Sequence, residues 1–146
     1  MIACVQRCTR AAVHVEGRLV GSIGAGLLVL VGIEKDDDGA RAEALADRLV
    51  ELRIFEDPSG RMDRSARDAG AELLIVSQFT LAARLDRGRR PSFDQAAPPA
   101  VAEPLYERLI ERVRATGLRI ATGAFGARMA VELVNDGPVT FVIEQR

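Results

Sequence analysis

Short apolar segments recur along the chain, and most of them have the period of two that is typical of β-strands. Residues 2–15 alternate loosely and predict a strand, which turns at Glu16-Gly17 into a second strand over residues 18–23. Residues 27–31 are an uninterrupted apolar run, which predicts a strand buried on both faces. Glycines precede this run, but no helix follows it, so they indicate turns and bulges rather than a phosphate-binding loop.

Two segments have helical spacing instead. The first follows the acidic residues 36–38, which offer N-cap oxygens, and is expected to run to Leu52 over about 12–15 residues. Its apolar positions are Ala42, Leu45, Ala46, Leu49 and Leu52. The second is marked by Val101, Leu105, Leu109 and Val113 and is expected to end at a Gly117 cap. Pro104 is compatible with this helix only if it lies in the first turn.

The remaining apolar runs predict further strands. They cover residues 53–55, 71–77, 118–122, 129–134 and 139–143, with a turn at 57–60 and an irregular segment at 61–68. The resulting order is β-β-β-α-β-β-α-β-β-β. It predicts an α/β fold with a mixed, mainly antiparallel sheet, curled toward a barrel, and two packed helices. The length indicates a single domain, residues 1–146.

The stretch from Asn135 to Thr140 lies between the last two apolar runs and contains Gly137-Pro138. Asn-Asp-Gly-Pro is turn chemistry, because Asn and Asp bond back to their own backbone, Gly accepts unusual dihedrals and Pro fixes φ. One interpretation is an ordinary hairpin turn. The other is a rigid backbone projection that presents two carbonyl groups to a site. The pattern alone leaves both open.

Composition excludes several classes of function. The chain is 48% hydrophobic with a formal net charge of −1, so contact with nucleic acid requires a local basic patch. It has no Trp and one Tyr, which argues against an extended base-stacking platform. Two cysteines and one histidine, His14, are too few for a disulfide framework or a His/Cys metal site. We expect no cofactor, no metal, no DNA and no membrane partner, and a cytoplasmic location.

Candidate chemistry lies at the end of the buried strand over residues 71–77. It runs into Ser77, Gln78, Phe79 and Thr80, and α/β folds usually place their sites at such strand ends. Core packing is the other interpretation for Phe79. The next loop has the densest basic cluster of the chain, which is Arg84, Arg87, Arg89 and Arg90. This loop is either a solvated surface or a grip for phosphate groups.

Two motifs resemble the signatures of the D-aminoacyl-tRNA deacylase family: Ser77-Gln78-Phe79-Thr80-Leu81 and Asn135-Asp136-Gly137-Pro138-Val139-Thr140. Further stretches match in the same order, at residues 26–32, 52–57, 88–93, 102–106 and 122–126. The resemblance therefore covers nearly the whole chain. After Leu81 the family usually continues with an aromatic residue, a small residue and an acid. This chain has Ala82-Ala83-Arg84 there, so the loop that follows departs from the family pattern.

The resemblance implies a homodimer that hydrolyses the ester between a D-amino acid and tRNA. Gly137-Pro138 would be a cis dipeptide that enters the partner subunit's pocket and excludes L side chains, and glycyl-tRNA is a further expected substrate. Residues implied to bind the substrate are Gly123, Phe125, Gly126, Met129, Asn135 and Thr140. The first four would line the pocket for the terminal adenosine, and core packing is the other interpretation for Met129. Arg87, Arg89 and Arg90 would contact phosphates of the acceptor end.

The residues argue for a simple mechanism. His14 lies on a different predicted strand from Thr80, so no Ser-His-Asp arrangement is indicated. We favour attack by water, with backbone N–H groups around Phe79 and Thr80 holding the oxyanion, and Ser77 and Gln78 shaping the pocket. A covalent Thr80 mechanism and a generic esterase with Thr80 or Ser77 as nucleophile are alternatives. So is a non-catalytic dimer that binds the tRNA end or a nucleotide.

Overall fold

The computed structural model describes residues 1–86 and 88–146. Its strands and helices, in chain order, are β1 (Ile2–Val15), β2 (Arg18–Ile23), β3 (Gly26–Gly32), α1 (Gly39–Glu51), β4 (Phe55–Glu56), β5 (Met62–Arg64), α2 (Ala66–Ala69), β6 (Glu72–Ser77), the 3₁₀ helix η1 (Phe79–Ala82), α3 (Pro99–Arg114), β7 (Ile120–Thr122) and β8 (Ala130–Glu144). None of the helices described is long and apolar enough to cross a membrane.

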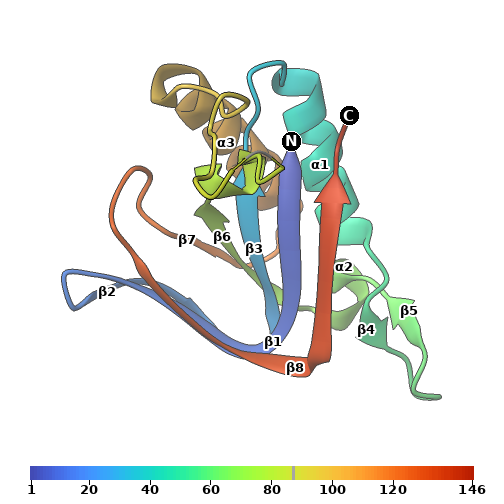
Figure 1. The fold of residues 1–146 in the computed structure, drawn as a ribbon. Helices are drawn as coiled ribbons and strands as arrows, with labels where there is room; N and C mark the ends of the chain where they lie inside the picture. The colour runs from blue at the N-terminus through green and yellow to red at the C-terminus, as the bar shows by residue number, and fades with distance from the viewer. Residues whose placement is uncertain (87) are drawn as a thin grey trace.

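The main sheet is mixed, as the sequence predicts. Its strand order is β2-β1-β3-β6-β7, with β8 paired to β1. β1 is antiparallel to β2, β3 and β8, whereas β3–β6 and β6–β7 are parallel. The sheet curls until β2 approaches β7 (Figure 1). A Cβ atom on Gly21 would lie 2.4 Å from the Thr122 carbonyl oxygen, so glycine permits this approach. The predicted curl toward a barrel is therefore confirmed.

β1 and β8 bend together at one corner of the sheet (Figure 1). The first half of β1 pairs with β3 and with the C-terminal half of β8, and its second half pairs with β2 and the N-terminal half of β8. The register between β1 and β8 shifts at the corner, between Gln6 and Cys8 and again between Cys8 and Arg10. Such irregularities bend a strand and increase its local twist. The Gly137-Pro138 segment of β8 lies at this bend.

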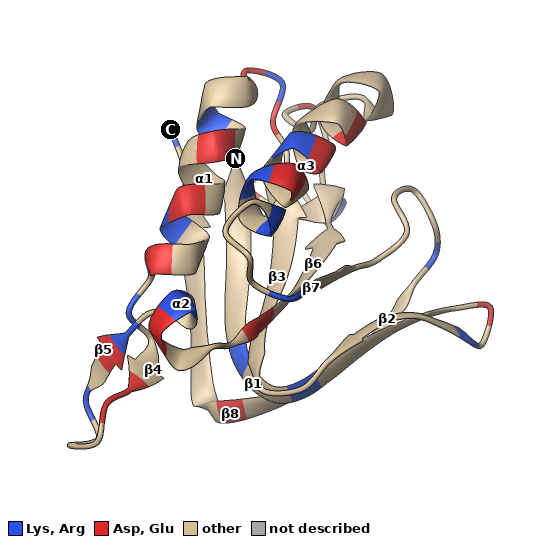
Figure 2. Ribbon diagram, turned by 180° about the vertical axis from the view of Figure 1, so that it is seen from behind, with Lys and Arg blue, Asp and Glu red and all other residues tan. Residues whose placement is uncertain are grey.

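Helices α1 and α3 pack against each other and against the apolar face of the sheet. Their buried positions, with those of β1, β3 and β6, form one continuous core. Charged residues occupy the outward faces (Figure 2), where Arg108 pairs with Glu43 and Arg112 with Asp47. The hydrogen bond from Arg112 lowers the pKa of Asp47. Because exposed ion pairs contribute little, the apolar core holds the helix pair in place.

The first helix agrees with its prediction. Asp38 is the N-cap, and its side chain accepts a hydrogen bond from the Arg41 N–H. For the second helix three details were wrong. It ends at Arg114 with Ala115 as its C-cap, so Gly117 lies beyond the cap. α3 begins at Pro99, so Pro104 lies beyond the first turn. Proline has no N–H, so the carbonyl four residues earlier has no partner in the helix. Both that position and the Pro104 ring are exposed, so water can bond to this carbonyl instead. Val101 is 42% exposed, because the buried stripe runs through Ala102, Tyr106 and Leu109 instead.

The short helix α2 is a further difference from the prediction of two helices. It spans Ala66–Ala69 and so begins within residues 61–68, for which the sequence predicts irregular structure. Ser65 and Asp68 form a reciprocal capping box at its start, and Gly70 ends it with a φ of 61°. With only four residues, α2 is too short to show hydrophobic periodicity, and only the capping signal could have revealed it.

Candidate functional site

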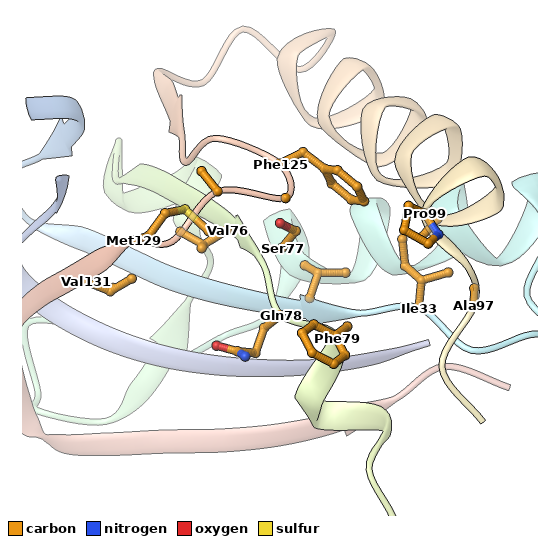
Figure 3. A pocket seen from close by; sticks show the side chains of 14 residues that line it. Ile33, Val76, Ser77, Gln78, Phe79, Ala97, Pro99, Phe125, Met129 and Val131 are labelled. Carbon is orange, nitrogen blue, oxygen red and sulfur yellow. The ribbon is translucent and has the colours of Figure 1, made fainter. Parts of the chain in front are cut away.

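A cavity of about 490 Å³ opens at the end of β6 (Figure 3). One wall comes from Ser77, Gln78 and Phe79, and the opposite wall comes from Phe125, Gly126, Ala127, Met129 and Val131. Residues at the start of α3 and the preceding loop close a third side. The position agrees with the prediction from the buried strand, because the cavity begins where the polar side chains follow the apolar run.

Two backbone donors lie at the end of the first wall, in Phe79 and the residue that follows it. The Gln78 N–H bonds to the Val31 carbonyl and extends the β3–β6 ladder by one residue. The first hydrogen bond of η1 then runs from the Leu81 N–H to the Gln78 carbonyl (3.2 Å). The N–H groups of Phe79 and Thr80 lie before this bond, and no acceptor for them is found among the described residues. They are available to an oxygen atom at the end of β6.

The side chains of this wall differ in their placement. The Gln78 amide donates to the Thr80 hydroxyl oxygen, which orients both side chains. Thr80 does not line the cavity, and His14 pairs in the other part of the sheet with Leu19 and Ala130. Phe79 is 58% exposed, with its ring 5.0 Å from that of Phe93, so the core-packing interpretation of Phe79 is wrong.

The opposite wall is a turn. The Ala127 N–H donates to the Ala124 carbonyl (3.2 Å), and Gly126 has a φ of +74°, which favours glycine at this position. Phe125 is the second residue of the turn and lines the cavity. Of the four residues implied for a nucleoside pocket, Phe125, Gly126 and Met129 line the cavity. Gly123 lies behind it and borders a second hollow.

Tyr106 supports the turn from behind. Its hydroxyl donates to the Ile75 carbonyl (2.7 Å), which also accepts the Gly123 N–H (3.2 Å). Burial raises the pKa of Tyr106, so the hydroxyl stays protonated and keeps its donor. The Tyr106 ring lies 5.8 Å from the Phe125 ring. One carbonyl of β6 thus ties α3 and the turn to the strand that carries Ser77.

The Gly137-Pro138 segment is a bulge. Gln6 pairs with Thr140 and Cys8 with Asn135, so Arg7 alone faces residues 136–139 of β8. The hairpin interpretation is therefore wrong, because β8 continues from Ala130 to Glu144 and both of its halves pair with β1. The peptide bond between Gly137 and Pro138 is cis, as the resemblance implies. Both residues are exposed, which agrees with the alternative interpretation of a projection.

Side chains on both strands hold the bulge. The Val139 N–H donates to the Asn135 amide oxygen (2.7 Å), and the Asn135 amide nitrogen donates to the Thr140 hydroxyl (2.9 Å). Arg7 Nε donates to the Asp136 carbonyl (3.1 Å) and Nη1 to the Ile54 carbonyl (2.8 Å). Arg7 is only 6% exposed. Arg7 was not among the residues predicted from the sequence, although a charged residue that continues the buried face of Ala3 and Val5 was a usable signal.

The bulge and the cavity are separate within one chain. None of the residues from Asn135 to Thr140 lines the cavity. The structure therefore brings together Ser77, Gln78, Phe79, Phe125, Gly126 and Met129, and it forms a second group from Asn135, Gly137, Pro138 and Thr140. A single chain does not join the two groups.

The basic loop closes on itself. Arg84 and Ser92 exchange two backbone hydrogen bonds (2.8 and 3.0 Å), and the exposed Arg89 and Arg90 lie between them. The prediction for Arg87 falls outside the described residues. Phe93 follows the loop, and its ring lies 5.0 Å from that of Phe79, which lines the cavity, so the loop is joined to the first wall through this contact.

The cavity itself is electrically neutral. Among the described residues that line it there is no ionisable side chain. In residues 1–86 and 88–146, no three or more His, Cys, Asp or Glu side chains gather as metal ligands. Burial raises the pKa of Cys4 and Cys8, and neither lines the cavity. This arrangement can therefore act on a substrate through backbone N–H donors and through the shape of the cavity, without ionisable side chains in the wall.

Comparison with known proteins identifies the family. The family profile described as D-Tyr-tRNA(Tyr) deacylase matches residues 4–144. The chain belongs to this family. A Pelobacter propionicus protein is 55% identical over 145 residues, which cover 99% of this chain and 100% of that one. An Escherichia coli K12 protein is 54% identical over 144 residues, with 99% of each chain covered. Both are named D-aminoacyl-tRNA deacylase.

Two solved structures share the fold of this chain. A structure titled c-Myc DNA Unwinding Element Binding Protein superposes with a TM-score of 0.94 and 42% identity, covering 100% of this chain and 99% of that one. A probable eukaryotic D-amino acid tRNA deacylase superposes with a TM-score of 0.83 and covers 97% and 98% of the two chains. Because the two sequences are only 20% identical, this second similarity shows a shared fold and nothing more.

Proposed function

We propose that this chain, acting as one domain over residues 1–146, is a D-aminoacyl-tRNA deacylase. It hydrolyses the ester that joins a D-amino acid to the terminal ribose and releases free tRNA and the D-amino acid. Family membership supports the reaction. The observation that carries the assignment is a neutral cavity with two backbone N–H groups beside it that have no acceptor among the described residues: that of Phe79, which lines the cavity, and that of Thr80, the next residue. Such a site suits an activated ester, which needs positioning and oxyanion stabilisation more than acid–base groups.

Water is the nucleophile in this proposal. The N–H groups of Phe79 and Thr80 hold the oxyanion of the tetrahedral intermediate, and the terminal ribose hydroxyl of the tRNA assists proton transfer. Ser77 and Gln78 shape the wall. The Thr80 oxygen already accepts a hydrogen bond from Gln78, and among the described side chains no histidine or carboxylate is hydrogen-bonded to it, which argues against a covalent threonine.

Chirality is read by the bulge of a second copy of the chain. In a homodimer, Gly137 and Pro138 of one subunit enter the cavity of the other, and their carbonyls accept hydrogen bonds from the substrate amino group. An L side chain then meets backbone, which cannot swing aside. Asn135 and Thr140 act by holding the shape of the bulge. Because glycine has no side chain, glycyl-tRNA is proposed as a second substrate.

The tRNA end is held on both sides of the cavity. Phe125 and Met129 contact the terminal adenosine, with Gly123 and Gly126 shaping their turn. Arg89 and Arg90, with Arg87, contact phosphates of the acceptor end, so affinity falls as salt rises. A cytoplasmic location accords with this substrate.

The test is hydrolysis of D-tyrosyl-tRNA beside L-tyrosyl-tRNA by the purified protein, with the Thr80→Ala variant alongside. We expect rapid loss of the D ester alone, and a Thr80→Ala rate within about tenfold of wild type, because only a neutral hydrogen bond is removed. Cleavage of neither ester despite tRNA binding would support a non-catalytic binding dimer, favoured otherwise only by the unusual Ala82–Arg84 segment. Loss of all activity in Thr80→Ala would favour threonine as nucleophile.

The neutral cavity predicts an unusual pH dependence. Between about pH 5.5 and 8.5, kcat should rise smoothly as the attacking water is more easily deprotonated, without the bell shape that an enzyme acid and base produce. The substrate amino group titrates at about pH 8 and should affect only KM. KM rises above that pH because the deprotonated amine has lost a proton that it donates in a hydrogen bond to the enzyme. Initial rates corrected for spontaneous hydrolysis measure this profile. An inflection shared by kcat and kcat/KM would reveal an essential ionisable group.

A further inference from the structure

A sulfur atom holds the turn that carries Phe125. The Ala124 N–H donates to Met129 Sδ at 3.4 Å, across five positions of the chain. Thioether sulfur is a weak acceptor, and main-chain amides in proteins usually bond to oxygen. Ala124 is nevertheless only partly exposed, so its N–H gains from having a partner.

The position of this sulfur is fixed by its surroundings. A Cβ atom on Gly123 would lie 2.6 Å from Met129 Sδ and 3.4 Å from a methyl group of Val76. The sulfur therefore packs on the bare backbone of Gly123, beside the strand that leads to Ser77, and Figure 3 shows Met129 next to Val76. Glycine at position 123 is needed because the sulfur occupies the space of its side chain.

The hydrogen bonds of the turn show what the sulfur contributes. Gly123 is tied to Ile75 of β6, and Ala127 is tied back to Ala124 within the turn. Between these two bonds, the contact with Met129 joins the Ala124 N–H to a residue beyond the turn. Phe125 follows Ala124 directly and points into the cavity (Figure 3). A shift of Ala124 therefore moves the aromatic wall.

We propose that Met129 is a positioning residue: its sulfur, by accepting the Ala124 N–H, sets the place of Phe125 and so the affinity of the cavity for the nucleoside end of the substrate. This role rests on the proposed function. It is separate from any contact that the Met129 side chain makes with the substrate. A thioether suits the position because it offers an acceptor while keeping the cavity wall apolar.

The matched experiment replaces Met129 with leucine, which keeps an apolar side chain of similar volume and removes the acceptor. Met62→Leu is the control, because Met62 is exposed on β5, outside the cavity. In Met129→Leu we expect KM for D-tyrosyl-tRNA to rise about threefold to tenfold, with kcat within about twofold. The Kd for free adenosine should rise by the same factor. Met62→Leu should leave all three values unchanged.

Amide hydrogen exchange followed by NMR gives a second readout. In Met129→Leu the Ala124 amide should exchange about tenfold faster, while the amides of β6 and α3 keep their protection. A general loss of protection would mean that Met129 only supports the core. Unchanged Ala124 exchange would also overturn the proposal, whatever the value of KM, because the loss of a direct Met129 contact with the adenosine would raise KM as well. If the wild type cleaves no ester, the proposed function fails, but adenosine affinity and Ala124 exchange still decide the role of Met129.

Discussion

The Gly137→Ala variant is expected to hydrolyse D-tyrosyl-tRNA about 100-fold more slowly than wild type, because the bulge no longer fits its place. Gly137 has a φ of +143°, which L side chains rarely adopt. An added Cβ would lie 2.6 Å from Val139 Cγ2 and 3.0 Å from the Val139 nitrogen. That nitrogen donates to Asn135, so relief of the clash disturbs the hydrogen bond that closes the bulge.

Single-turnover rates on D- and L-tyrosyl-tRNA measure this effect as a ratio. The ratio of the D rate to the L rate should fall steeply, because hydrolysis of the D ester is lost while that of the L ester stays at background. Gly24→Ala is the matched control, since no atom lies within 4 Å of its added Cβ and its φ is not positive. A thermal melt of each variant checks that it folds. If Gly137→Ala kept the wild-type ratio, the bulge would not be the element that discriminates between D and L substrates.

Much of the fold follows from local sequence pattern. The strands that begin the chain, the buried strand that ends at Ser77 and the helix capped by Asp38 all have the expected positions. Each is long, periodic or continuously apolar, and its burial is decided by its own residues. The cavity at the end of β6 was predictable for the same reason, because polar residues follow directly on a buried run.

The bulge shows where local pattern fails. Asn135 and Asp136 have the side chains of a turn, and Asn135 does bond locally, to Val139 and Thr140. The chain does not reverse, however, because both apolar runs find pairing partners on the same long strand, β1. Pairing between strands so far apart in the sequence depends on the tertiary structure, so it cannot be inferred from a short stretch of residues. The contact of Arg7 with the Asp136 carbonyl, across 129 positions, could not be read from sequence for the same reason.

Because the bulge and the cavity are separate within one chain, we expect two inactive variants to recover activity when they form mixed dimers. Gly137→Ala damages the bulge and leaves the cavity intact. Ala127→Trp does the opposite, since Ala127 lines the cavity and lies outside both apolar core clusters, so the indole can fill the space. Each variant alone should be nearly inactive. Unfolded together in equal amounts and refolded, they should recover about a quarter of wild-type activity, because half the dimers are mixed and each mixed dimer has one intact site.

The alternative architecture gives a different number. If the bulge served the cavity of its own chain, every subunit in the mixture would carry one defect, and activity would stay at background. The same outcome would follow if the protein acted as a monomer. Refolded wild type sets the full value, and refolding Gly137→Ala with itself sets the background. Recovery in the mixture would therefore require both a dimer and a site completed across its interface, because an intact cavity and an intact bulge meet only between different subunits.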